Sequence, residues 1–146
     1  MIMIHGTVVE IAGAGVLLRG PSGSGKSALA LRLIDMPGFG IGQEVLRARL
    51  VADDQIVIER TAKGLIARPP ENLAGLLEIR GLGIVKIAHI AQVQLTLVVD
   101  LAPAPSIARM PEPYEVVTEI EAVTLRRMVL DGADAAAPAK IRANLL

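Results

Sequence analysis

Eight consecutive residues, Gly20-Pro21-Ser22-Gly23-Ser24-Gly25-Lys26-Ser27, match the pattern G-x-x-x-x-G-K-[ST] at every fixed position. In this pattern the glycines let backbone N–H groups surround phosphate oxygens, the lysine places a positive charge beside the outer phosphates, and the serine hydroxyl can ligate Mg²⁺. A helix that starts at Lys26 adds the positive end of its dipole. The motif, together with Ala28 behind it, predicts a nucleotide-binding site. A plain glycine-rich turn before a helix is the weaker interpretation.

Two adjacent carboxylates, Asp53 and Asp54, follow the apolar run at residues 49–52. We expect a strand to end there, and ligands of open α/β sheets bind at the carboxyl ends of strands. Neighbouring side chains of a strand point to opposite faces, so one carboxylate would face the terminal phosphate. Such a carboxylate can accept a proton from a hydroxyl. The sequence does not separate the two roles, and a polar turn between two strands is the alternative.

Three further residues could complete a phosphoryl-transfer site. Glu78 and Arg80 alternate onto one face of a short predicted strand, where Glu78 could ligate Mg²⁺ and Arg80 could stabilise transition-state charge. A surface ion pair explains the same spacing. His5 stands beside Gly6, and a lone histidine is more often structural than catalytic. The sequence alone leaves both interpretations open.

The elements that must position these residues follow from apolar periodicity and turn residues. The glycine-rich loop lies between an apolar strand and an amphipathic helix over Lys26–Asp35, which Pro37 ends. A mobile surface loop is expected over 36–47, and an irregular segment over 102–113. A C-terminal helix over 134–146 has Asp134 as its expected N-cap. The expected strands cover residues 7–11, 16–19, 49–52, 56–58, 65–68, 84–90, 93–101, 115–120 and 123–130.

Composition bounds the class of protein. The 146 residues are 52% hydrophobic and 21% charged, which is typical of one globular α/β domain over residues 1–146. Fifteen basic residues balance fifteen acidic ones and aromatic residues make up 1%, so nucleic acid is not an expected partner. No apolar run is long enough to span a membrane. The absence of cysteine fits a cytoplasmic protein. The mean hydropathy of +0.52 indicates buried strands or the interface of a homo-oligomer.

Taken together, the motifs resemble the C-terminal catalytic domain of bacterial HPr kinase/phosphorylase, in the short form of alphaproteobacteria. The resemblance covers about residues 4–100, and the order and approximate spacing of its blocks match. The matching blocks are Ile4-His5-Gly6, Gly13 to Leu18, Gly20 to Ser27, Leu50 to Asp54 and Leu77 to Ile84.

The resemblance implies a P-loop-containing mixed sheet, like the nucleotide domain of phosphoenolpyruvate carboxykinase. It implies ATP-dependent, Mg²⁺-assisted phosphorylation of a serine on an HPr-like phosphocarrier of the phosphotransferase system. By the resemblance, Lys26 contacts phosphate, Ser27 and Glu78 are metal ligands, and the pair Asp53-Asp54 supplies the proton acceptor. His5 belongs to the active-site set of the family.

The chain departs from the family in its second half. The family carries a basic loop with the pattern Pro-Val-x-x-Gly-Arg-Asn, used for the reverse, phosphorylase reaction, and residues 111–127 do not contain it. This departure argues against phosphorylase activity. It also motivates a second hypothesis, a nonenzymatic ATP-binding sensor that regulates a phosphotransferase or two-component partner. A small-molecule kinase with residues 36–47 as a short lid is the weaker third hypothesis.

Overall fold

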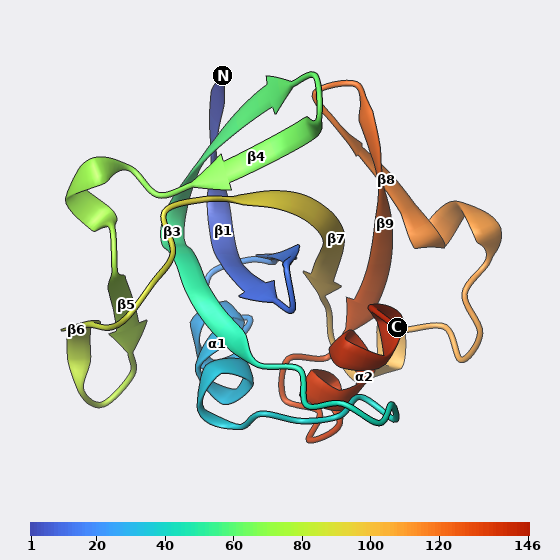
Figure 1. Cartoon of the computed structure of the whole chain (residues 1–146). Helices are drawn as coiled ribbons and strands as arrows, with labels where there is room; N and C mark the ends of the chain where they lie inside the picture. Colours follow the sequence, from blue (N-terminus) through green and yellow to red (C-terminus); the bar gives the residue numbers. More distant parts are fainter.

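The computed structural model describes all residues, 1–146, and the chain folds into a strongly curved sheet with helices on one side (Figure 1). Neither helix has the length and apolar character needed to cross a bilayer. The strands are β1 (Ile2–Ile11), β2 (Ala14–Arg19), β3 (Ala48–Thr61), β4 (Gly64–Arg68), β5 (Leu76–Ile79), β6 (Gly83–Lys86), β7 (Val93–Leu101), β8 (Val117–Ile120) and β9 (Val123–Leu130). The helices are α1 (Lys26–Asp35) and α2 (Ala137–Asn144), with three short 3₁₀ turns at Glu71–Leu73, Ala104–Ser106 and Pro113–Val116.

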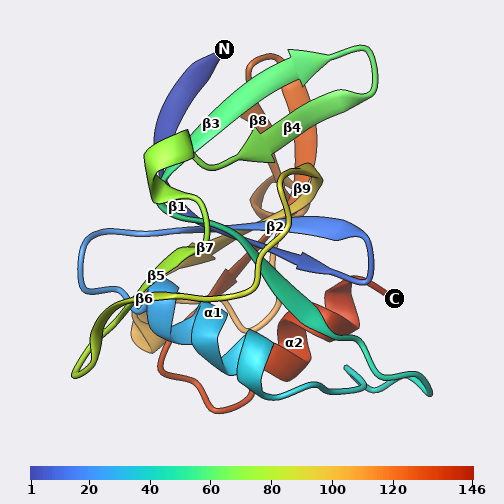
Figure 2. The ribbon, with the colours of Figure 1, turned by 60° about the vertical axis from the view of Figure 1, so that its left-hand side comes forward.

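Seven strands form one mixed sheet in the order β2-β1-β3-β4-β7-β9-β8. Because β2 also pairs with β7, the strands β2, β1, β3, β4 and β7 close into a barrel. The strands β2, β7 and β9 run parallel to one another, and their carboxyl ends lie on the side where α1 and α2 pack. The remaining strands, β5 and β6, form a separate hairpin beside α1 (Figure 2).

Two aliphatic clusters hold the fold together, one on each face of the curved sheet. The cluster inside the barrel has 13 buried residues, among them Val8, Leu17 and Val98. The cluster between the sheet and the two helices has 14, among them Leu29, Leu33 and Ile141. Burial of aliphatic side chains contributes about 1.5–3 kcal/mol each, so this packing fixes α1 and the loop before it against the sheet.

Several elements agree with the sequence. The expected α-helix over Lys26–Asp35 is confirmed residue for residue. The first hairpin turns at Ala12 and Gly13, both with positive φ, as a two-residue turn between β1 and β2 requires. The expected strands over 56–58 and 65–68 are confirmed within β3 and β4, which form a hairpin with Thr61 paired to Gly64.

Other expectations about the elements are wrong. β3 does not end at Asp53 but continues to Thr61, because β1 pairs alongside it past both aspartates. The pairing continues even though Asp54 takes a left-handed φ of 71°. The expected strand over 84–90 stops at Lys86, because Lys86 pairs with Leu76, the first residue of the antiparallel partner β5.

Two more corrections concern single residues. Arg80 lies in the turn after β5 rather than on the strand face of Glu78, because the hairpin reverses at Arg80–Leu82. Asp134 is not the N-cap of α2, which begins only at Ala137. Its carboxylate instead accepts a hydrogen bond from the N–H of Ala136 at 2.8 Å and organises the turn before the helix.

Candidate functional site

The glycine-rich loop connects the end of β2 to the first residue of α1. Gly25 is the N-cap with a φ of 96°, a left-handed conformation that glycine adopts without strain. The Lys26 ammonium folds back and donates hydrogen bonds to the carbonyls of Gly20 (2.7 Å) and Pro21 (3.1 Å). The loop is therefore shaped around a positive charge, at the positive end of a helix dipole.

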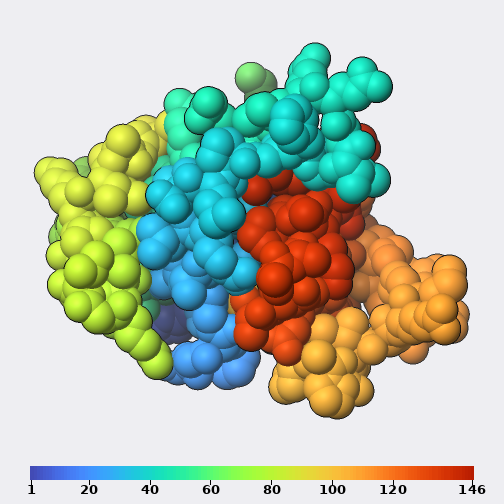
Figure 3. Space-filling model, turned by 90° about the horizontal axis from the view of Figure 1, so that it is seen from below, coloured from blue at the N-terminus to red at the C-terminus, as the bar shows by residue number.

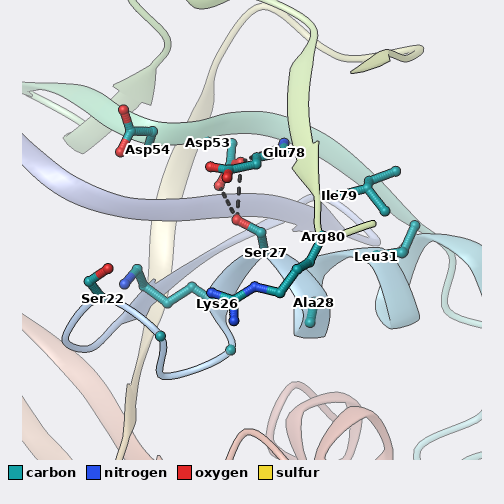
Figure 4. A pocket seen from close by; sticks show the side chains of 12 residues that line it. Ser22, Lys26, Ser27, Ala28, Leu31, Asp53, Asp54, Glu78, Ile79 and Arg80 are labelled. Carbon is teal, nitrogen blue, oxygen red and sulfur yellow. Dashed lines mark hydrogen bonds between the residues drawn. The ribbon is translucent and has the colours of Figure 1, made fainter. Parts of the chain in front are cut away.

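Asp53 connects this loop to the sheet and to the β5–β6 hairpin (Figure 4). Only 5% of the residue is exposed. Its carboxylate accepts hydrogen bonds from the hydroxyl of Thr7 on β1 (2.8 Å), the hydroxyl of Ser27 on α1 (2.9 and 3.1 Å) and the backbone N–H of Glu78 on β5 (3.1 Å). Buried carboxylates need such partners, so Asp53 fixes three elements around one charged group.

We refer to Asp53 and its three hydrogen-bond partners as the hub. A pocket of about 430 Å³ opens in front of it. It brings together Lys26 and Ser27 of the loop, Asp53 and Asp54 of β3, and Glu78 and Arg80 of the hairpin. Ala28, Leu31 and Ile79 form its apolar part. Lys26 and Arg80 can bind an anion in this pocket. Asp54 and Glu78 add two carboxylates that make no hydrogen bond.

Asp54 differs from Asp53 in every respect that bears on chemistry. It is exposed, its carboxylate makes no hydrogen bond, and it lies at the outer edge of the pocket (Figure 4). Across the pocket, the Arg80 side chain extends from the hairpin toward the glycine-rich loop. The structure thus separates the two adjacent aspartates, which the sequence left equivalent.

His5 is placed apart from the other predicted site residues. It lies on β1, opposite Gln55, and is exposed. It shares the strand face of Thr7, but it does not line the pocket. The nine residues predicted for the nucleotide, 20–28, all belong to the loop and the start of α1, and six of them line the pocket: Ser22, Gly23, Gly25, Lys26, Ser27 and Ala28.

The side chains of the pocket could bind Mg²⁺ only together with further ligands such as phosphate oxygens and water. No group of three or more His, Asp or Glu side chains is arranged to hold a metal ion by itself. The Ser27 hydroxyl and the carboxylates of Asp53 and Glu78 nevertheless offer oxygen atoms to the same pocket. Mg²⁺ is characteristically bound by one or two such side chains plus phosphate oxygens and water, and the residues present fit that pattern.

Two residues that hold the site were missed from the sequence. Thr7 is fully buried and orients Asp53. Its signal was a hydroxyl at a core-facing position of β1, two residues before Val9. Arg32, one turn from the end of α1, donates to the carbonyls of Asp134 (3.1 Å) and Gly132. Nothing local in the sequence distinguishes it from an ordinary helix-surface arginine.

A second charged network lies below the loop, at the ends of the parallel strands. Asp100 on β7 receives Arg19 of β2 at 2.7 Å and Arg127 of β9 at 2.5 Å. Burial opposes ionisation of Asp100, but the hydrogen bonds and charges of the two arginines outweigh it and lower the pKa of Asp100 below its ordinary value. Arg19 directly precedes Gly20, so this network fixes the start of the loop.

Comparison with known proteins agrees with this combination of fold and site. The sequence pattern of the family described as the HPr Serine kinase C-terminal domain matches residues 1–102. Proteins named HPr kinase/phosphorylase from Bordetella pertussis and Bordetella bronchiseptica are 41% identical over 109 residues, which is 69% of this chain and 32% of theirs. The chain thus spans about a third of the length of these curated relatives.

A solved structure shows the same fold. The Hpr(Ser) kinase/phosphatase from Coxiella burnetii superposes with a TM-score of 0.78, at 22% sequence identity, over 99% of this chain and 88% of that one. The molecule is therefore a mixed α/β protein with a large mixed sheet of the HPr kinase type. The chain belongs to the HPr Serine kinase C-terminal domain family.

Proposed function

We propose that this chain is an ATP-dependent protein kinase that phosphorylates a serine of an HPr-like phosphocarrier protein. The observation that carries the proposal is the pocket, in which the glycine-rich loop with Lys26 faces the buried Asp53 and the exposed Asp54. We infer that the loop is a P-loop, in a nucleotide domain like that of phosphoenolpyruvate carboxykinase. Membership in the HPr kinase family supports an HPr-like protein as the acceptor. The need for ATP supports a cytoplasmic location.

In the proposed reaction the backbone N–H groups of residues 20–27 and the Lys26 ammonium bind the triphosphate. Ser27, Asp53 and Glu78 would hold Mg²⁺, which supplies charge neutralisation of the phosphates. Arg80 stabilises negative charge that develops on the transferred group. Because Asp53 is already hydrogen-bonded by three groups, its role is to orient Ser27 and this metal site.

We assign the proton-accepting role to Asp54. Its exposed carboxylate is free to accept the proton of a seryl hydroxyl that approaches from solvent. The seryl oxygen then forms a bond to the γ-phosphorus while the bond from that phosphorus to the bridging β–γ oxygen breaks, and ADP leaves. His5 flanks this entrance on β1, and we propose that it contacts the acceptor rather than the nucleotide.

The test uses purified protein, radiolabelled ATP, Mg²⁺ and the HPr-like protein of the same organism. Lys26→Ala should abolish nucleotide binding. Asp54→Asn should retain binding and lower the transfer rate about 10²–10⁴-fold, the usual contribution of a general base. Asp35→Asn, an exposed aspartate at the end of α1, is the matched control.

Three results decide between the hypotheses. Transfer by Asp54→Asn at the wild-type rate would refute the assignment of the base. Tight ATP binding by the wild-type protein with no transfer to any phosphocarrier would favour the nonenzymatic sensor. The reverse reaction, supplied with phosphoserine protein and inorganic phosphate, should be absent, because the chain lacks the basic loop of the family. The two arginines at the end of the corresponding segment, Arg126 and Arg127, do not line the pocket, and Arg127 is bound to Asp100.

A further inference from the structure

A separate hollow lies between β9, α2 and the segment that connects β7 to β8. Its volume is about 630 Å³, within the range of about 300–1,000 Å³ typical of small-molecule sites. None of its lining residues belongs to the acidic pocket or to the glycine-rich loop. We call it the β9 hollow, and no step of the proposed reaction uses it.

The outer wall of the β9 hollow is the arch, residues 102–116, which leaves the sheet after β7 and returns beside β9 (Figure 1). Figure 3 shows the arch in gold and orange, projecting beside α2 in red. Both of its ends are tied to the body of the protein. The N–H of Ala104 donates to the Asp131 carboxylate (3.1 Å), and Arg127 of β9 donates to the carbonyl of Glu115 (3.0 Å). These contacts hold the hollow open without a ligand.

Much of the lining is apolar. Met128 and Leu130 contribute from β9, and Ile107 and Val116 contribute from the arch. Val116 keeps 39% of its surface exposed although it lies in a wall of the hollow. Aliphatic walls of this kind bind the apolar part of a ligand because they remove it from water, and the flexible Met128 can adapt to its shape.

The charged part of the lining is mainly positive. Three cationic residues, Arg109, Arg127 and Lys140, stand against one carboxylate, that of Glu115. Arg109 is exposed at the middle of the arch and forms no ion pair. Complementary charge selects ligands, so this hollow favours an anion, whereas the acidic pocket offers carboxylates.

The two cations that do have partners keep free donors. Arg127 donates to Asp100 and to the carbonyl of Glu115, and Lys140 donates to Asp134. A guanidinium and an ammonium group each carry more N–H groups than these partners use. The carboxylates of Asp100 and Asp134 lie outside the lining. The remaining N–H groups can form charge-assisted hydrogen bonds with an anionic ligand.

Arg127 also connects the β9 hollow to the glycine-rich loop. It pairs with Asp100, which in turn pairs with Arg19 (2.7 Å), the residue directly before Gly20. A ligand bound to Arg127 therefore contacts the network that fixes the start of the loop, without entering the acidic pocket.

We propose that the β9 hollow binds a small organic anion with an apolar body, such as an aliphatic or aromatic carboxylate or sulfonate. Its anionic group contacts Arg109 and the free donors of Arg127 and Lys140, and its apolar body lies on Met128 and Leu130. The inference goes beyond the proposed function. Because no residue of the acidic pocket takes part, it stands or falls independently of phosphoryl transfer.

The probe is anilinonaphthalene sulfonate, an aromatic anion whose fluorescence increases on binding, and its uncharged counterpart is phenylnaphthylamine. Arg109→Gln removes the unpaired charge, and Ala108→Trp fills the hollow from the arch. The matched controls are Arg47→Gln and Ala135→Trp, at exposed positions that do not line the hollow. Thermal melts check that each variant is folded, and fluorescence titration gives the dissociation constants.

We expect wild-type protein and both controls to bind the sulfonate equally well, and about tenfold more tightly than the uncharged probe, because only the anion uses the charged donors. Arg109→Gln should weaken binding of the sulfonate by about three- to tenfold. Ala108→Trp should abolish saturable binding. Unchanged affinity in both folded variants would overturn the proposal, as would wild-type protein that binds the two probes equally or binds neither.

Discussion

Asp53 is the residue on which the geometry of the acidic pocket depends. Hydrogen bonds from three groups on three elements reach a carboxylate that is almost fully enclosed. In a low-dielectric setting a charged group is stable only while such partners are present. The neighbouring Asp54 has none, and the different roles proposed above for these two identical side chains rest on this difference in environment.

Replacement of Thr7 by valine tests the hub at its least exposed contact. Thr7→Val keeps the shape of the side chain but removes the donor to Asp53, which should lower the free energy of unfolding by about 1–2 kcal/mol. Urea unfolding measures this change. Thr124→Val, at an exposed position of β9, should stay within about 0.5 kcal/mol. Equal effects of the two variants would show that the Thr7 bond does not support the hub.

Helix α2 acts on the site from a distance through one side chain. Arg142 is 2% exposed and donates to the carbonyl of Leu33 at the end of α1 (2.8 Å) and to that of Leu46 in the following loop (2.8 Å). Burial lowers the pKa of its guanidinium. The forked geometry fixes two carbonyls at once, so α2 stabilises the far end of the helix that carries Lys26 and Ser27.

Arg142→Met should leave both carbonyls without a donor and destabilise the protein by about 2–3 kcal/mol. Lysine at the same position should not restore stability, because one ammonium cannot reproduce the planar fork. Arg126→Met, which removes an exposed contact to the carbonyl of Asn144, is the control and should cost less than about 0.5 kcal/mol. Thermal melting compares the three; full rescue by Arg142→Lys would contradict the account.

At the scale of the whole molecule, the closed barrel and the parallel strands β2, β7 and β9 form one rigid support for the loop. Asp100 joins all three of these strands through Arg19 and Arg127. Because its pKa is lowered in the folded state, its contribution to stability is present above the unfolded pKa, near 3.8, and is lost as the pH falls through the lower folded value.

Wild-type protein should therefore lose stability on acidification below about pH 4, and part of that loss should be absent in Asp100→Asn. At pH 7 the variant should melt at a lower temperature than the wild type. The measurement is the melting temperature from pH 7 to pH 2.5, with the exposed aspartate variant Asp35→Asn as the control. A parallel pH dependence in wild type and Asp100→Asn would refute the role of Asp100.

Local patterns predicted α1 and most of the strands, because turn residues and apolar spacing act over a few neighbours. The course of β3 was mispredicted, since an Asp-Asp pair is common in turns and only pairing with β1 keeps the chain extended there. The site residues of the loop, β3 and the hairpin were predicted from motifs. The roles of Thr7, Arg32 and Arg142 depend on contacts across 46 to 109 residues, which no local pattern contains.

The hydrogen bonds of Lys26 have a consequence for the shape of the glycine-rich loop. Its ammonium donates hydrogen bonds to the carbonyls of Gly20 and Pro21 and so joins the first residue of α1 to the start of the loop. Because a hydrogen bond from a charged donor is stronger than a neutral one, these two contacts stabilise the conformation of the loop. The main chain at the mouth of the pocket is therefore held in place by a side chain of the loop itself.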